Sequence, residues 1–116
     1  MKAEVSREGD LLIAAPAGRL GKEEADGLIE KLKPDLAEGV GALLLDLSAV
    51  DYMTSAALGV IILLLQKVRS RGGRMAVAAP NERVHLLLEV AGLNQLLALC
   101  RSRQEGERDL AEGPAG

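Results

Sequence analysis

The sequence predicts a single α/β domain, built on a mixed and mostly parallel sheet of four to five strands with about four helices. The chain has 116 residues, which fits one domain, and 48% of them are hydrophobic, which is enough for a core. Short apolar runs of strand length alternate with segments of helical periodicity, as in sheets covered by helices. The run "VGALLLDLS" is apolar without alternation, which indicates a strand buried on both faces.

The first third of the chain predicts two strands and a helix. "EVSREGDLLIAAPAGRL" contains two short strands joined by a turn at Glu8-Gly9-Asp10, and we expect the second to end at 16–18. A helix follows over 22–39, where Pro34 is expected to kink or interrupt it because proline removes a backbone donor. Its apolar residues recur at helical spacing: Ala25, Leu28, Ile29, Leu32 and Leu36.

The rest of the chain alternates strand and helix three times. The buried strand ends at Asp46, and a helix runs from Ser55 to about Arg71, where Gly72-Gly73 ends it. A strand "RMAVAA", a helix "NERVHLLLEVAG", a short strand "LLALC" and a weak helix "SRQEGERDLAE" complete the chain. We expect the domain to span 1–112 and residues 113–116 to form a disordered tail.

Composition argues against nucleic acid as a partner. Phe and Trp are absent and Tyr52 is the one aromatic residue, so no platform for base stacking is available. The formal charge is −3, whereas a phosphate-backbone binder carries a basic face. Arg69, Arg71 and Arg74 cluster on a short turn, which is typical of a solvated helix end.

The chain is expected to be cytoplasmic and not inserted in a membrane. Cys100 is the single cysteine, so an intramolecular disulfide is excluded. The N-terminal stretch "MKAEVSREGD" has no apolar signal region. The longest apolar run, Ala56 to Leu65, is shorter than the roughly 20 residues of a spanning helix.

Catalytic and cofactor signals are weak. Ser55, His85 and either Asp46 or Asp51 supply the residue types of a hydrolase triad. However, "TSAAL" is not a G-x-S-x-G elbow, and His85 lies in mid-helix beside leucines. The sequence has neither a metal-ligand cluster nor a glycine-rich phosphate loop. We therefore expect no enzyme activity, no metal and no cofactor.

The helix from Ser55 has apolar residues on two sides. A buried stripe is predicted at Ala57, Leu58, Ile61, Leu64, Leu65 and Val68. The opposite row holds Ser55, Gly59, Ile62, Leu63 and Gln66, and it is more apolar than a solvated face. One interpretation is a docking surface for another protein. The alternative is that a neighbouring helix covers Ile62 and Leu63.

Ser55 stands where a loop becomes this helix. Backbone donors there are unpaired, so a phosphate on the hydroxyl is tolerated by the fold and still confronts a partner docked along the outer row. That would make a switch. The alternative is that Thr54 or Ser55 is an ordinary N-cap.

The segment from Asp46 to Leu93 resembles the anti-sigma factor antagonists, or anti-anti-sigma factors, of the STAS domain family. The matching pieces are Asp46-Leu47-Ser48, Ser55 to Gly59, Gly72-Gly73 and Gly92-Leu93, with "GRL" at Gly18 to Leu20. The combination is specific although each piece is weak, and the likeness covers at least residues 3–100.

The resemblance implies a partner-switching mechanism. Such proteins bind a kinase-like anti-sigma factor, which then releases its sigma factor, so that transcription is controlled indirectly. The kinase phosphorylates a serine at the start of this helix, here Ser55, and a metal-dependent serine phosphatase removes the mark. The resemblance implies partner contacts at Thr54, Ser55, Gly59, Ile62 and Leu63, with Asp46 and Asp51 as supporting residues nearby.

This chain departs from the family pattern at three positions. Thr54 and Gly21 stand where the family often has Asp, and Ala57 replaces a glycine. The surroundings of Ser55 are therefore less acidic, and Thr54 becomes a second candidate phosphorylation site, although a cap role fits it better. The alternative function is a STAS scaffold that is not phosphorylated, in a signalling assembly or as an accessory subunit of a membrane-transporter complex.

Overall fold

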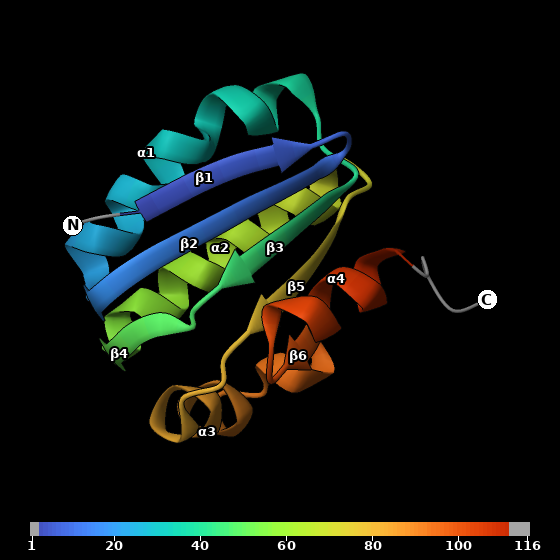
Figure 1. The fold of residues 1–116 in the computed structure, drawn as a ribbon. Helices are drawn as coiled ribbons and strands as arrows, with labels where there is room; N and C mark the ends of the chain where they lie inside the picture. Colours follow the sequence, from blue (N-terminus) through green and yellow to red (C-terminus); the bar gives the residue numbers. More distant parts are fainter. Residues whose placement is uncertain (1–2, 112–116) are drawn as a thin grey trace.

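The computed structural model describes residues 3–111, so the expected boundary at 112 and the expected tail 113–116 lie outside the described residues. A six-stranded sheet forms the centre of the domain (Figure 1). Its order is β1-β2-β3-β5-β6, and β4 pairs with β2 outside this path. β1 is antiparallel to β2, and every other pairing is parallel. The predicted α/β class and mixed sheet are confirmed, with one strand more than expected.

The elements follow the predicted alternation closely. The strands are β1 (Ala3–Glu8), β2 (Leu11–Leu20), β3 (Ala42–Asp46), β4 (Ala49–Met53), β5 (Arg74–Ala78) and β6 (Ala98–Cys100). The helices are α1 (Lys22–Glu38), α2 (Ser55–Ser70), α3 (Glu82–Val90) and α4 (Arg103–Ala111), with a 3₁₀ turn at Leu93–Gln95 before β6.

Strand β2 continues past the expected end at 16–18. Its first half, up to Ala14, pairs with β3, and its second half, from Ala17, pairs with β4. Pro16 falls between the two halves, where no ladder partner on that side requires its missing N–H. Gly18 adopts φ +83°, and the pairing with β4 shifts register directly after it. Proline and glycine therefore mark a change of partner within one long strand.

Strand β4 is the element that the sequence analysis missed. The Asp46 carboxylate accepts a hydrogen bond from the Ser48 backbone nitrogen at 3.0 Å and another from the Ser48 hydroxyl. The nitrogen of Val50 donates to the Leu47 carbonyl at 3.0 Å. These bonds form a tight turn, which moves the chain from its place beside β5 to the far half of β2.

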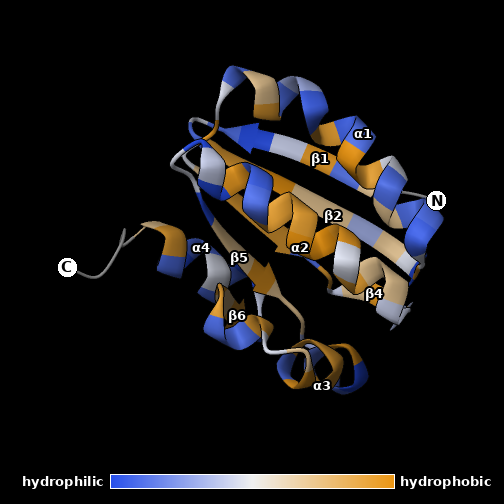
Figure 2. Ribbon diagram, turned by 180° about the vertical axis from the view of Figure 1, so that it is seen from behind, coloured by the Kyte–Doolittle hydropathy of each residue, from blue (hydrophilic) through white to orange (hydrophobic). Residues whose placement is uncertain are grey.

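The sheet has a hydrophobic core on each face. Helices α1 and α2 pack side by side on one face, and α4 covers β3, β5 and β6 on the other (Figures 1 and 2). The larger core includes Leu12, Leu43 and Leu45, each with no exposed surface. The smaller core under α4 contains Ile13, Leu44 and Leu110. Alternate residues of β2 and β3 thus enter different cores, which explains the continuous apolar runs.

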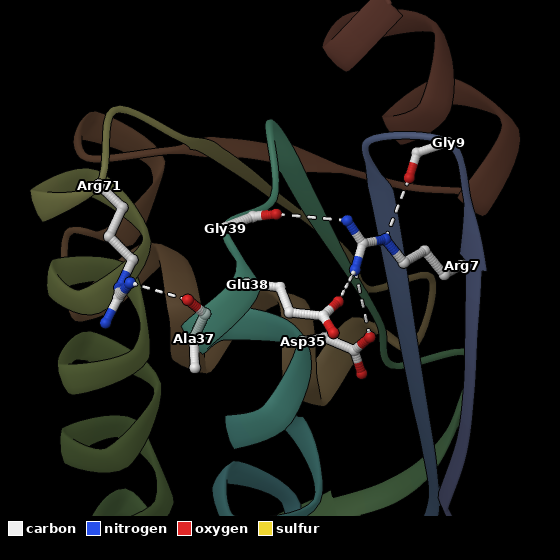
Figure 3. Close-up of polar contacts among 7 residues, drawn as sticks. All are labelled: Arg7, Gly9, Asp35, Ala37, Glu38, Gly39 and Arg71. Carbon is white, nitrogen blue, oxygen red and sulfur yellow. Dashed lines mark hydrogen bonds and ion pairs between the residues drawn. The ribbon is translucent and has the colours of Figure 1, made fainter.

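Helix α1 continues through Pro34, so of the two expected effects of the proline the interruption does not occur. Leu32 and Leu36, which flank the proline, are 0% and 5% exposed, so their burial holds both halves against the core. A side chain from β1 also binds the end of α1 (Figure 3). Arg7 contacts the carboxylates of Asp35 and Glu38 at 3.4 and 3.0 Å, and it donates to the Gly39 carbonyl at 3.3 Å.

None of the helices within residues 3–111 has the length and apolar character needed to cross a membrane.

Candidate functional site

The start of α2 is fixed by Thr54. Its backbone nitrogen donates to the Leu20 carbonyl at 3.1 Å, which ties the helix start to the end of β2. Its hydroxyl accepts a hydrogen bond from the Ala57 nitrogen at 3.2 Å, the geometry of an N-cap. The cap alternative therefore holds for Thr54, whose side chain is half-buried.

Ser55 is the first residue of the helix and is exposed, as expected. Its hydroxyl has no polar partner within residues 3–111. The first-turn amides of a helix lack intrahelical acceptors, and the positive end of the dipole lies there. The site therefore offers a free hydroxyl in a setting that accommodates added negative charge.

A hollow of about 410 Å³ lies beside the helix start, between the beginnings of α1 and α2. Its lining is Arg19, Gly21, Lys22, Glu23, Glu24, Thr54 and Ala56. The hydrogen bond and the charge of Asp26 raise the pKa of Lys22. Arg19 lies over the Tyr52 ring, 5.6 Å from its centroid. The hollow is lined by both signs of charge.

Glu24 is a residue of this region that sequence reasoning missed. Its Oε1 accepts a hydrogen bond from the Gly21 nitrogen at 2.8 Å, and it lies 2.7 Å from where a Cβ on Gly21 would be. A carboxylate thus occupies the space of the missing side chain at position 21. A glutamate three residues after an N-cap is the sequence sign of a capping box. It was not recognised here because the cap residue is glycine and not serine or threonine.

The outer row of α2 divides into exposed and half-buried positions. All six residues of the predicted inner stripe are buried. Of the outer row, Ser55, Gly59 and Gln66 are exposed, and Leu63 is 53% exposed. Ile62 is half-buried and packs against the large core. The alternative that a neighbouring helix covers both residues is therefore wrong for Leu63, and Ile62 is only partly covered.

Asp46 and Asp51 differ in their surroundings. Asp46 is 7% exposed, and its carboxylate contacts Ser48 and lies 3.9 Å from the Arg103 guanidinium. Its polar contacts within the described chain go to these two residues. Asp51 is exposed on β4, three residues before the cap. Proximity of either carboxylate to the Ser55 hydroxyl stays a prediction.

His85 and Cys100 lie in the fold interior. His85 is 6% exposed, and its Nδ1 is 3.0 Å from the Ala79 carbonyl, so the ring joins α3 to the end of β5. Burial, with Glu105 and Asp109 nearby, raises the pKa of the Cys100 thiol. Neither residue lines the hollow beside the α2 start. Within residues 3–111, the acidic, histidine and cysteine side chains form no group that could hold a metal ion.

Comparison with known proteins identifies the family. Residues 2–106 match the sequence model of the STAS domain. The chain is a member of the STAS domain family. It is 32% identical over 90 residues to an anti-sigma-B factor antagonist of Bacillus subtilis, which covers 78% of this chain and 82% of that protein. A Thermotoga neapolitana protein, named as a candidate anti-sigma factor antagonist, is 37% identical to this chain over 92 residues. The match covers 78% of this chain and 80% of that protein.

Solved structures agree on the fold of this STAS domain. A crystal structure titled as a candidate anti-sigma factor antagonist from Thermotoga maritima superposes with a TM-score of 0.84, at 26% identity and 94% coverage of both chains. The unphosphorylated anti-sigma factor antagonist SpoIIAA gives a TM-score of 0.75 at 12% identity, with 97% of this chain and 100% of that chain covered. At that identity the second match concerns the fold alone.

Proposed function

We propose that this STAS domain is a phosphorylation-controlled anti-sigma factor antagonist. In its unphosphorylated form it binds a kinase-like anti-sigma factor, which then releases its sigma factor and permits transcription. The same kinase phosphorylates Ser55 and ends the interaction, and a metal-dependent serine phosphatase restores it. The domain acts by binding in the cytoplasm, without a catalytic step, metal or cofactor of its own.

The observation that carries this proposal is the contrast between Thr54 and Ser55. Thr54 already caps α2, with its hydroxyl 3.2 Å from the Ala57 nitrogen, so Ser55 is not needed for the fold. A hydroxyl that is exposed, free of polar partners within residues 3–111 and placed on the first turn suits modification by a kinase. Ser55 is therefore the proposed switch, and Thr54 is a weaker second candidate.

The outer row of α2 supplies the proposed docking surface. Gly59 leaves the helix backbone open, since an added Cβ would meet nothing within 4 Å, and Leu63 offers an exposed apolar side chain. A partner that covers this row also covers Ser55, four residues before Gly59. A phosphate there would have to be desolvated or face acidic groups in the complex. Thr54 and Ile62 complete the proposed contact set. Asp51 is proposed as a nearby support, and Asp46 as an indirect support through the turn before β4.

The test is titration of variants with a kinase-like anti-sigma factor, followed by calorimetry. Ser55→Ala is expected to bind with wild-type affinity and to stay unmodified in ATP, as measured by intact mass. Ser55→Asp is expected to bind roughly a hundredfold more weakly, which corresponds to about 3 kcal/mol, while its melting temperature is preserved. Leu63→Glu is expected to weaken binding, and Glu107→Gln on α4 is the control.

Two outcomes would contradict the switch. One is wild-type affinity of Ser55→Asp, and the other is phosphate on Thr54 alone in the kinase reaction. If no anti-sigma factor binds and transporter subunits are encoded nearby, the alternative of a non-phosphorylated STAS scaffold or accessory subunit stands instead.

A further inference from the structure

A second hollow between α1 and α2, at their carboxyl ends, has a uniform charge. It measures about 230 Å³ and is lined by Lys33, Leu36, Ala37, Lys67 and Arg71. The two helices run parallel, since Gly21 and Thr54 meet at one end and Ala37 and Arg71 meet at the other. The hollow near Ser55 and this one therefore lie at opposite ends of the same helix pair.

The acidic residues at the end of α1 are turned away from this hollow. Asp35 and Glu38 contact Arg7 from β1, whereas Arg71 reaches the Ala37 carbonyl from the opposite side at 3.5 Å (Figure 3). Helix α2 contains no acidic residue. At the end of α1 the carboxylates therefore lie on the β1 side, where Arg7 contacts them, and Arg71 lies on the α2 side.

The cations that line the hollow make few contacts with acidic groups of the domain. Lys33 is paired with Glu30 at 2.7 Å, and its side chain is 56% exposed. Arg71 has the one long bond to Ala37. Lys67 is exposed and has no polar side-chain contact within residues 3–111. Lys67 and Arg71, together with Lys33, whose charge Glu30 partly offsets, produce a positive field around this small hollow that attracts carboxylates.

The hollow is continuous with the proposed docking surface. Gly59, Leu63 and Lys67 follow one another at four-residue spacing, so they form a row that slants by about 40° per step round α2 toward the α1 side. Lys67 is about 18 Å along the axis from Ser55, at 1.5 Å per residue. A partner that follows the row from Ser55 past Leu63 arrives at Lys67 and Arg71.

We propose that this basic hollow receives an acidic segment of the same protein partner. The inference rests on the proposed function, because it assumes that the partner covers the row of α2. Carboxylates of the partner would meet Lys33, Lys67 and Arg71 while apolar groups contact Leu63. The exposed charges would mainly speed association and fix the orientation of the partner, with phosphate on Ser55 acting at the other end.

The first experiment measures affinity for the kinase-like anti-sigma factor as a function of salt. The double variant Lys33→Gln/Lys67→Gln is expected to bind about tenfold more weakly at low salt and to show a flatter salt dependence. Arg108→Gln, which removes an exposed cation from α4, is the matched control and should bind like wild type. Thermal melts establish that each variant is folded.

The outcome separates this inference from the proposed function. If Leu63→Glu weakens binding but Lys33→Gln/Lys67→Gln binds like wild type, the proposal of an acidic partner segment is wrong, and the proposal that the partner docks on the outer row of α2 is supported. If both variants bind like wild type, the docking row itself is wrong, and this inference falls with it.

The second experiment uses a probe without the partner. An acetylated hexaglutamate peptide, titrated into the labelled domain, is expected to shift backbone amide NMR signals around Lys33, Lys67 and Arg71 and to saturate. The double variant should lose these shifts. Equal shifts with inorganic phosphate, or tighter binding of a single-stranded oligonucleotide at the same residues, would overturn the assignment to an acidic protein segment.

Discussion

At the residue scale, two adjacent hydroxyls at the start of α2 have different structural roles. The Thr54 hydroxyl accepts the Ala57 amide, whereas the Ser55 hydroxyl faces solvent. Thr54→Ala is therefore expected to lower the free energy of unfolding by about 1 kcal/mol, because a helix cap is lost. Ser55→Ala should change it by less than about 0.5 kcal/mol. Urea denaturation measures both, and a larger loss for Ser55→Ala would show that the cap is misassigned.

Asp46 allows a structural role to be separated from a role at the site. Asp46→Ala removes the acceptor of two hydrogen bonds from Ser48 in a partly buried turn, which should cost about 1–3 kcal/mol. Phosphorylation of Ser55 should continue at temperatures where the variant is folded. Asp51→Ala, on the exposed side of β4, is the matched control for stability. Normal stability of Asp46→Ala together with lost phosphorylation would place Asp46 at the site instead.

At the element scale, helix α1 depends on groups outside it. Its last turn carries no basic residue and ends with Asp35 and Glu38 at the negative end of the dipole. Arg7 offsets this by contacting both carboxylates and the Gly39 carbonyl, with its side chain 31% exposed. A cation from β1 therefore substitutes for a cation within the helix, and it also joins β1 to α1.

Arg7→Met keeps most of the apolar stem and removes the charge. We expect a loss of about 1 kcal/mol in the free energy of unfolding, reduced at high salt because the contacts are partly exposed. Lys22→Met, which breaks an exposed pair with Asp26 at 2.8 Å, is the control and should change stability by less than half as much. Equal losses in the two variants would contradict a special role for Arg7.

At the scale of the whole molecule, the sheet separates two faces that can be perturbed independently. Helix α4 approaches closely through Gly106, where an added Cβ would lie 2.6 Å from the Leu44 Cδ1. Gly106→Val should therefore overpack the small core and cost about 1–3 kcal/mol. The outer row of α2 lies on the opposite face, so anti-sigma factor affinity should be unchanged where the variant is folded. A folded Gly106→Val domain that loses affinity would show that the two faces are coupled.

The sequence by itself determined the class of fold, the family and the prominence of Ser55. Helical spacing placed six residues of α2 in the core, and all six are buried. The run "ALLLD" indicated a strand covered on both faces, and Leu43, Leu44 and Leu45 have no exposed surface. These features can be predicted locally, because the spacing of apolar residues within one segment determines which of its side chains are buried.

The tertiary structure decided what depends on contacts between distant segments. The helix at Pro34 survives because Leu32 and Leu36 are buried against the sheet, and β2 passes Pro16 because its partner changes there. Strand β4 exists because Asp46 turns the chain toward β2. The basic hollow brings Lys33 to Lys67 and Arg71 across two helices. Residues 34 positions apart meet only when the helices pack in parallel, and no local propensity encodes that meeting.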